Sequence, residues 1–427
     1  MTAPSAAQDT AGAAGPAGAP SAASAGPFSG LKVIDCASYI AAPAAAMLLS
    51  DFGADVIKIE PPDGDPHRSL YQRVGAQDIR RNFIWDLNSR NKRSLALDLK
   101  QPAGQAVLHR LVAQADVFIT NLPLPVRGRL GMAAARLRAL NPRLVYASMT
   151  GYGETGPEAA KSAFDVTAYW ARSGLMDLVR ADHTAPPTRP VAGMGDHPSA
   201  TTLFAGIAMA LYRRERTGQG AEVQSSLMAN GLWSNAIQVQ AALSGAQFPP
   251  RQGRHAAPNP LSNIYRCADD RWLSLVVLNE ARQWPPLLAV LGLASLAADT
   301  RFASTEARAA HAPALIAAFD QALAQQPLAH WQTALTAAGI TFGVVARLAD
   351  MADDAQMQAS GALRPCPQHG GLTLASPLSI DGSTQRPPGP APALGQHSAD
   401  LLREAGWDDA EITRLMADAV VFGAAAP

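Results

Sequence analysis

The sequence is poor in cysteine: its 427 residues include only Cys36, Cys267 and Cys366, which lie far apart. No CxxC pair is present, and no two of the nine histidines are spaced as HxxxH. A disulfide framework and a structural zinc site are therefore not expected. A reducing cytoplasm is the simplest location for a chain of this kind.

The sequence also lacks an excess of charge, because Lys and Arg together number 35 and Asp and Glu together number 35. A balanced chain gives no reason to expect nucleic acid or an anionic membrane surface as a partner. No run of 18 apolar residues suggests a membrane span. Residues 1–27 are almost all Ala, Gly, Pro, Ser and Thr, without the regions of a secretory signal, and predict a disordered tail.

The chain does contain 48% hydrophobic residues, which alternate between patterns typical of strands and of helices. Strands are expected at 31–36, 56–60, 94–99, 115–120 and 144–149, and helices at 42–51, 104–114 and 134–140. Such alternation predicts an α/β fold with a parallel sheet covered on both faces. Ligands bind these sheets beyond the carboxyl ends of the strands. The expected site therefore lies in the loops after Cys36, Glu60, Thr120 and Met149.

The second half of the chain predicts a smaller unit and a return to the first. We divide the sequence into a large domain (28–225), a linker (226–258), a small domain (259–345) and a segment that returns to the large domain (346–427). The small domain is expected to contain strands at 264–267 and 272–278 and helices at 284–291 and within 314–338. Pro327 should divide the last of these into two helices.

The longest helical pattern begins near Asp196 and ends at Gly218. Asp is a favoured N-cap, and Pro198 suits the first turn. One interpretation is therefore that Asp196 caps this helix. The other is that its carboxylate is the nucleophile of an acyl transfer, with N–H groups of the helix start stabilising oxyanions. The local pattern leaves both open.

Two further features concern possible ligands. Residues 151–156 read GYGETG and match GxGxxG after a strand, but Pro157 follows at once and no suitable helix comes next, so a nicotinamide-dependent oxidoreductase is a minor alternative. Basic residues also gather near the strand ends and suit a ligand with several phosphates: Arg68, Lys92, Arg93, Lys100, Arg127 and Arg129.

Several segments, taken in order, carry a family resemblance. They are LKVIDCASYIAAPAAAMLLSDFGADVIKIEPPDGDPHR (31–68), NKRSLALDLK (91–100), ADVFITNLPLPVRGRLG (115–131), NPRLVYASMTGYGETGP (141–157) and GDHPSATTLFAGIAMALYRRERTGQG (195–220), with PALGQHSADLL (392–402) as a closing motif. Together they resemble the class III CoA-transferase family, which includes formyl-CoA transferase, carnitine CoA-transferase and the α-methylacyl-CoA racemases.

The resemblance implies a Rossmann-like large domain, a smaller α+β domain and an interlocked homodimer. It implies that Asp196 is the catalytic nucleophile and that the substrates are an acyl-CoA and a carboxylic acid, with no permanently bound cofactor. It places CoA against the residues that match the family's binding segments: Ser38, Tyr39, Ile40, Ala41, Leu97 to Lys100, Asn121, Leu122, Pro123 and Arg129.

The sequence departs from formyl-CoA transferase in three places. Ile40 and Pro61 stand where that enzyme has a Gln and an Arg, and residues 259–263 (NPLSN) stand where it has a glycine-rich loop. A formyl or oxalyl substrate is therefore not implied. Phe164 occupies the position of the racemases' proton-transferring His, although Asp165 follows it. An acyl-CoA racemase or epimerase, and a CoA-binding protein without turnover, remain as alternatives.

Overall fold

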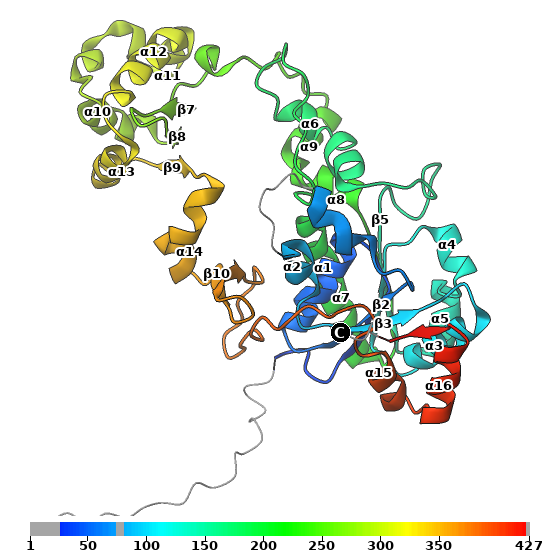
Figure 1. The fold of residues 1–427 in the computed structure, drawn as a ribbon. Helices are drawn as coiled ribbons and strands as arrows, with labels where there is room; N and C mark the ends of the chain where they lie inside the picture. Colours follow the sequence, from blue (N-terminus) through cyan, green and yellow to red (C-terminus); the bar gives the residue numbers. More distant parts are fainter. Residues whose placement is uncertain (1–25, 74–80, 424–427) are drawn as a thin grey trace, which may run out of the picture.

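A computed structural model describes residues 26–73 and 81–423, so residues 1–25 of the predicted tail lie outside the described part. Figure 1 shows a central sheet with helices on both sides and a smaller group of elements, at the upper left of the view, that stands apart from it. No helix in the described ranges is both long and apolar enough to cross a bilayer.

The central sheet has seven strands in the order β12-β3-β2-β1-β4-β5-β6. The first five in chain order are β1 (Lys32–Asp35), β2 (Asp55–Glu60), β3 (Arg93–Leu97), β4 (Val117–Thr120) and β5 (Val145–Thr150). They agree with the predicted strands to within two residues, and all pair in parallel. The sheet is completed by β6 (Glu222–Ser226), parallel to β5, and by β12 (Val421–Phe422), antiparallel to β3. The predicted parallel α/β sheet is confirmed, whereas β6 and β12 were not predicted.

Helices cover the two faces of the sheet with separate apolar cores. One face packs against α1 (Ala41–Asp51), α7 (Asp196–Thr217) and the start of α8 (Leu227–Ser234). The other packs against α3 (Pro102–Val112), α5 (Ala134–Leu140), α15 (Ser398–Glu404) and α16 (Asp409–Ala417). All of α1 is buried, and its run of alanines allows close approach to α7. The sheet therefore holds α7, and with it Asp196, in a fixed place.

The smaller group has its own core of apolar residues. Its antiparallel sheet is β7 (Ser262–Arg266), β8 (Trp272–Val276) and β9 (Phe342–Val345). Its helices are α10 (Glu280–Val290), α11 (Thr305–Ala310), α12 (Ala312–Leu323) and α13 (Leu328–Ala337). Pro327 separates the last two, as predicted, because it is the N-cap of α13.

The connections between the two groups contain more structure than the sequence suggested. The predicted linker 226–258 includes α8 and α9 (Ala236–Leu243), so only the part from Ser244 onward is mainly irregular. The return includes α14 (Ala355–Ala359) and a hairpin of β10 (Leu363–Cys366) and β11 (Gly371–Leu374). The segment 346–427 thus contains a helix and a hairpin before it reaches the central sheet again.

Candidate active site

The site lies where the strand order of the sheet reverses. β1 has β2 on one side and β4 on the other, so the loops after β1 and β4 leave the sheet in different directions. Asn121, just after β4, bridges the gap: its Oδ1 accepts from the Ser38 backbone N–H at 2.8 Å, and its Nδ2 donates to the Ser38 carbonyl at 2.6 Å. The loop after β1 is therefore fixed to the loop after β4.

The loop after β1 has an unusual backbone. Tyr39 has a positive φ of 65°, a conformation that non-glycine residues seldom adopt. Its N–H donates to Asp65 Oδ1 at 3.3 Å, and the Lys58 ammonium donates to the Ala37 carbonyl. Because strained residues persist only where their surroundings hold them, these contacts indicate that the loop has a functional shape.

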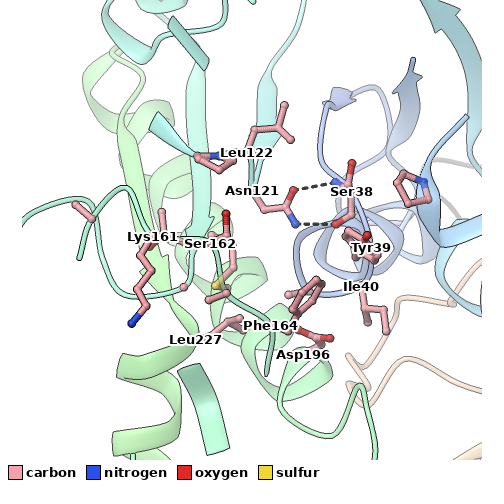
Figure 2. Close-up of a pocket in the computed structure, with 18 residues that line it drawn as sticks. Ser38, Tyr39, Ile40, Asn121, Leu122, Lys161, Ser162, Phe164, Asp196 and Leu227 are labelled. Carbon is pink, nitrogen blue, oxygen red and sulfur yellow. Dashed lines mark hydrogen bonds between the residues drawn. The ribbon is translucent and has the colours of Figure 1, made fainter. Parts of the chain in front are cut away.

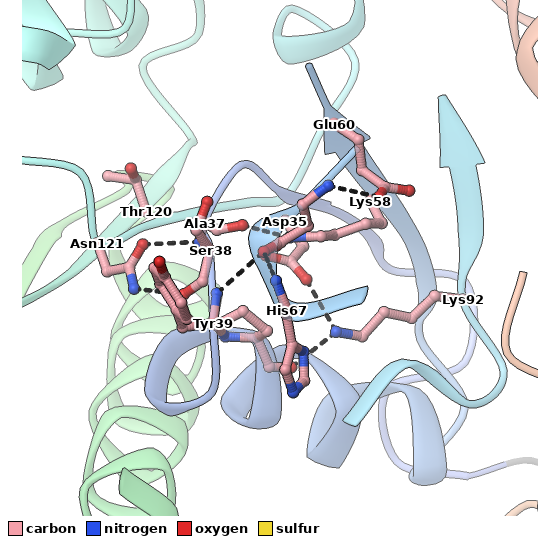
Figure 3. A network of polar contacts seen from close by, with 12 residues as sticks. Asp35, Ala37, Ser38, Tyr39, Lys58, Glu60, His67, Lys92, Thr120 and Asn121 are labelled. Carbon is pink, nitrogen blue, oxygen red and sulfur yellow. Dashed lines mark hydrogen bonds and ion pairs between the residues drawn. The ribbon is translucent and has the colours of Figure 1, made fainter. Parts of the chain in front are cut away.

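Beneath this loop lies a buried charge network (Figure 3). Lys58 Nζ is 2.7 Å from Asp65 Oδ2, and Lys92 Nζ is 2.8 Å from Asp35 Oδ2. Burial alone would lower the pKa of Lys58, but the carboxylates of Asp35 and Asp65 raise it above its usual value. The same paired residues also fix the loop, because Lys58 donates to the Ala37 carbonyl and Asp65 accepts from the Tyr39 N–H.

Asp196 lies in a pocket of about 290 Å³ beside this loop (Figure 2). Many of the predicted CoA-contacting residues line the same pocket: Ser38, Tyr39, Ile40, Ala41, Asn121, Leu122 and Pro123. They come from the two loops joined by Asn121 and from the start of α1. The fold thus brings the predicted nucleophile and most of the predicted CoA contacts to one cavity.

The interpretation of Asp196 as a helix cap is wrong. Gly195 is the N-cap of α7, and Asp196 is the first helical residue. The helix therefore begins one residue earlier than it would if Asp196 were the N-cap. Within the described residues no hydrogen bond to the Asp196 carboxylate is found. Burial, and then the nearby charge of Asp165, raise its pKa from 3.8 to about 7. Asp196 is thus a largely buried carboxylate whose position has no capping function.

Asp165 holds the turn that precedes Asp196. Its Oδ2 accepts from the backbone N–H groups of Gly193 at 2.9 Å and Gly195 at 3.1 Å, and its Oδ1 accepts from Val166 N–H at 2.7 Å. Asp165 is buried, so these bonds replace its hydration. Its carboxylate accepts hydrogen bonds from three backbone N–H groups, and these bonds fix the direction in which α7 begins.

A second pocket of about 220 Å³ adjoins the first, and both are lined by Ser38 and Leu122. Leu97, at the end of β3, and the exposed Lys100 line this second pocket. Arg129 is exposed nearby, on α4 (Leu124–Arg129), but lines neither pocket. Gln105 joins the two segments, since its Nε2 donates to the carbonyls of Leu99 and Arg129 at 3.1 and 3.0 Å.

The broader expectation of a cluster of six phosphate-binding cations is wrong. Four of them have carboxylate partners in the protein: Arg68 with Glu60, Lys92 with Asp35, Arg93 with Asp55 and Glu404, and Arg127 with Glu154. In the described ranges no ion pair involves Lys100 or Arg129. These two therefore remain as candidates. The sequence alone could not separate them from the other four, because it does not show which cations have internal partners.

Some residues of the site were not expected. Lys161, Ser162 and Ala163 line the first pocket from the loop after β5, and Leu227 lines it from α8. The prediction that the loop after Met149 contributes was correct, but no motif pointed to Lys161. The same loop contains GYGETG, and no helix follows it within residues 151–164. This backbone does not match the strand–turn–helix of a dinucleotide site.

Comparisons with known proteins give matches over most of the chain. The profile of the family described as CoA-transferase family III matches residues 28–398. The chain is 30% identical over 398 residues to (R)-2-hydroxy-4-methylpentanoate CoA-transferase of Clostridioides difficile, covering 92% of this chain and 98% of that protein. It is 36% identical over 388 residues to acetyl-CoA:oxalate CoA-transferase of Acetobacter aceti, covering 89% and 96%.

A solved structure shows the same fold. The crystal structure of a CAIB/BAIF family protein from Brucella suis is 29% identical in sequence and superposes with a TM-score of 0.79. The match covers 89% of this chain and 99% of that one, so it includes both the central sheet and the smaller group of elements.

Proposed function

Because the chain belongs to CoA-transferase family III, we propose that it moves CoA from an acyl-CoA thioester to a free carboxylic acid through covalent intermediates on Asp196. The observation that carries this proposal is the Asp196 carboxylate, which lies in the pocket lined by the loops after β1 and β4 and makes no hydrogen bond in the described part of the chain. A carboxylate without such partners is available to attack.

In the proposed reaction an Asp196 oxygen bonds to the thioester carbonyl carbon, the C–S bond breaks, and CoA leaves as a thiolate. A mixed anhydride remains on Asp196. The thiolate then attacks the Asp196 carbonyl of that anhydride, which forms an aspartyl-CoA thioester and releases the first acid. An acceptor carboxylate reverses the two steps. Each step exchanges one activated acyl group for another, so the reaction needs no ATP.

We assign CoA to the two adjoining pockets. Ser38, Tyr39, Ile40 and Ala41 would contact it beside Asp196, together with Asn121, Leu122 and Pro123. Leu97 and Lys100 would contact it in the second pocket, with Arg129 beyond. The shared lining residues Ser38 and Leu122 support one elongated ligand that occupies both pockets. Lys100 and Arg129 are exposed cations suited to its phosphates.

A racemase is a poorer match. Proton transfer on both faces of a carbon requires two groups that exchange protons. Phe164 cannot exchange one, and the carboxylate of Asp165 is occupied by three backbone N–H groups. Asp196 is the carboxylate that stays available for proton exchange beside Phe164, and Tyr39 and Lys161 are the other titratable side chains in the described lining of the pocket.

We also propose that the protein is a homodimer in which two chains interlock. The smaller group of elements stands apart from the sheet in Figure 1 and is joined to it by two long connections. Large apolar side chains on and beside α8 and α9 are strongly exposed, including Trp233 at 81%, Ile237 at 81% and Leu243 at 78%. Exposed apolar surface of this size supports contact with another chain.

The test of the proposed function is substitution of the nucleophile. Asp196→Ala and freshly prepared Asp196→Asn should lose CoA transfer measured by chromatography of acyl-CoA products, while their circular dichroism stays that of the wild type. Glu215→Gln, near the other end of α7, removes an exposed carboxylate and should leave transfer unchanged. Near-normal transfer by Asp196→Ala would contradict the assignment.

A further inference from the structure

The lining around Asp196 identifies the class of acyl group, an inference that rests on the proposed function. We propose that the preferred acid is a short branched or aromatic monocarboxylate, and that dicarboxylates such as succinate are poor substrates. The relatives named above act on acids of both kinds, so family membership does not decide this point. The side chains of this chain do.

Apolar side chains surround the approach to Asp196. Ile40 is buried and lies against the turn before the nucleophile, since a Cβ built on Gly193 would be 3.6 Å from Ile40 Cδ1. Tyr39 and Phe164 meet edge to face, with ring centroids 5.5 Å apart. Figure 2 shows Phe164 and Ile40 beside Asp196. A reacting acyl group would therefore lie among aliphatic and aromatic surfaces.

Apart from Asp196, the charged and amide groups that line this pocket are occupied or distant, and the hydroxyls of Ser38, Tyr39 and Ser162 carry no charge. Both ends of the Asn121 amide bond to Ser38. The Thr150 hydroxyl donates to the Ser225 carbonyl and accepts from Gly153 N–H. Lys161 is the cation among the lining residues, and Figure 2 shows its ammonium across the pocket from Asp196 and pointing away from it.

A second carboxylate on the substrate would consequently lose part of its hydration against Ile40, Tyr39 and Phe164 without gaining a cationic partner. It would also stand close to Asp196, which must itself be negative in order to attack. Burial of an unpaired charge is strongly unfavourable, whereas an apolar group gains free energy in the same place. The pocket of about 290 Å³ lies at the lower limit for ligand sites, which favours a short acyl group.

A matched pair of thioesters tests the inference. 4-Methylpentanoyl-CoA carries an isopropyl group where succinyl-CoA carries a carboxylate of nearly the same shape. With wild-type enzyme in excess and no acceptor, consumption of each thioester is followed by acid quench and chromatography. The rate constant for 4-methylpentanoyl-CoA should be greater by roughly tenfold or more, as expected for a charge that is partly desolvated and has no cationic partner.

The outcomes separate the two proposals. Equal or faster consumption of succinyl-CoA would overturn the inference and leave the transferase intact. If neither thioester were consumed and no adduct formed on Asp196, the proposed function would fail, and the inference with it.

A substitution at Phe164 provides a second test. Phe164 is 58% exposed, so Phe164→Arg should fold and would place a cation beside Asp196. The preference for 4-methylpentanoyl-CoA should fall at least tenfold. Phe248→Arg is the matched control, because Phe248 is also 58% exposed but lies outside the pocket, and it should keep the wild-type ratio. An unchanged ratio in Phe164→Arg would contradict the placement of the acyl group.

Discussion

At the scale of single residues, we expect the environment of Asp196 to set the pH dependence of the proposed transfer. Burial and the charge of Asp165 raise its pKa to about 7. Since only the ionised form attacks, kcat/KM should rise tenfold per pH unit below about 7 and level off above it. Measurement of kcat/KM from pH 5 to pH 9 with 4-methylpentanoyl-CoA as the donor tests this expectation. A value of kcat/KM that does not change down to pH 5 would contradict it.

Asp165→Asn should shift that profile to lower pH. The substitution removes the neighbouring negative charge. The Asn carbonyl oxygen can still accept from the N–H groups of Gly193 and Gly195, whereas its NH2 group cannot accept from Val166 N–H. Burial is the larger cause of the raised pKa, so the midpoint should move only part of the way toward 3.8. The control is Asp177→Asn, which removes an exposed carboxylate. If Asp165→Asn lowered kcat/KM without moving the midpoint of the pH profile, Asp165 would affect Asp196 only by holding the turn from Gly193 to Gly195.

The same raised pKa predicts a change in stability. Folded Asp196 binds its proton more tightly than the unfolded chain does, so its ionisation costs free energy of folding as pH rises from 3.8 to about 7. Asp196→Asn removes this cost and should be more stable than the wild type above pH 7, on the order of 4 kcal/mol. Below pH 4 the difference should vanish. Calorimetry at pH 4 and pH 8 compares the two proteins.

At the scale of elements, we propose that the loops that follow the strands hold CoA. Lys100→Ala and Arg129→Ala should each weaken CoA binding by roughly 1.5–3 kcal/mol, with turnover at saturation less affected. Titration calorimetry with CoA measures the affinity. Arg266→Ala, an exposed arginine on β7, is the control and should bind CoA normally. Unchanged affinity in both test variants would place the ligand elsewhere.

The sequence predicted elements well where the local pattern decides them. Short apolar runs between turns defined β1 to β5, and Pro327 divided α12 from α13. The sequence did not predict features that depend on contacts between residues far apart in the chain. The two residues of β12 form a strand because β3 offers an open edge. Arg68 and Arg127 resembled free cations because their partners, Glu60 and Glu154, are brought to them by the fold.

The same distinction applies to the site. The resemblance placed Asp196 and the loop from Ser38 to Ala41, which the structure gathers in one pocket. The cap interpretation failed because Asp165, distant in sequence, sets the turn and makes Gly195 the N-cap. Lys161 was not predicted to line the pocket, because a single lysine in a long loop belongs to no recognisable sequence motif.

At the scale of the whole molecule, we expect a dimer. Sedimentation equilibrium should give twice the chain mass of 44.6 kDa. Trp233→Glu should weaken the dimer, because it places a charge where we expect a partner to cover Trp233. Leu140→Glu, at the exposed end of α5 on the opposite face of the sheet, should not. A monomer at micromolar concentration would contradict the interlocked arrangement.

The central claim is that Asp196 forms a covalent bond with the acyl group, and peptide mass mapping tests it most directly. Wild-type protein is incubated with an acyl-CoA in deuterated buffer without an acceptor, then trapped with hydroxylamine and digested. The account predicts a hydroxamate on the peptide that contains Asp196, absent from Asp196→Asn, and no deuterium in the acyl chain. An unmodified Asp196 peptide together with deuterium next to the thioester carbonyl would contradict it and identify a racemase.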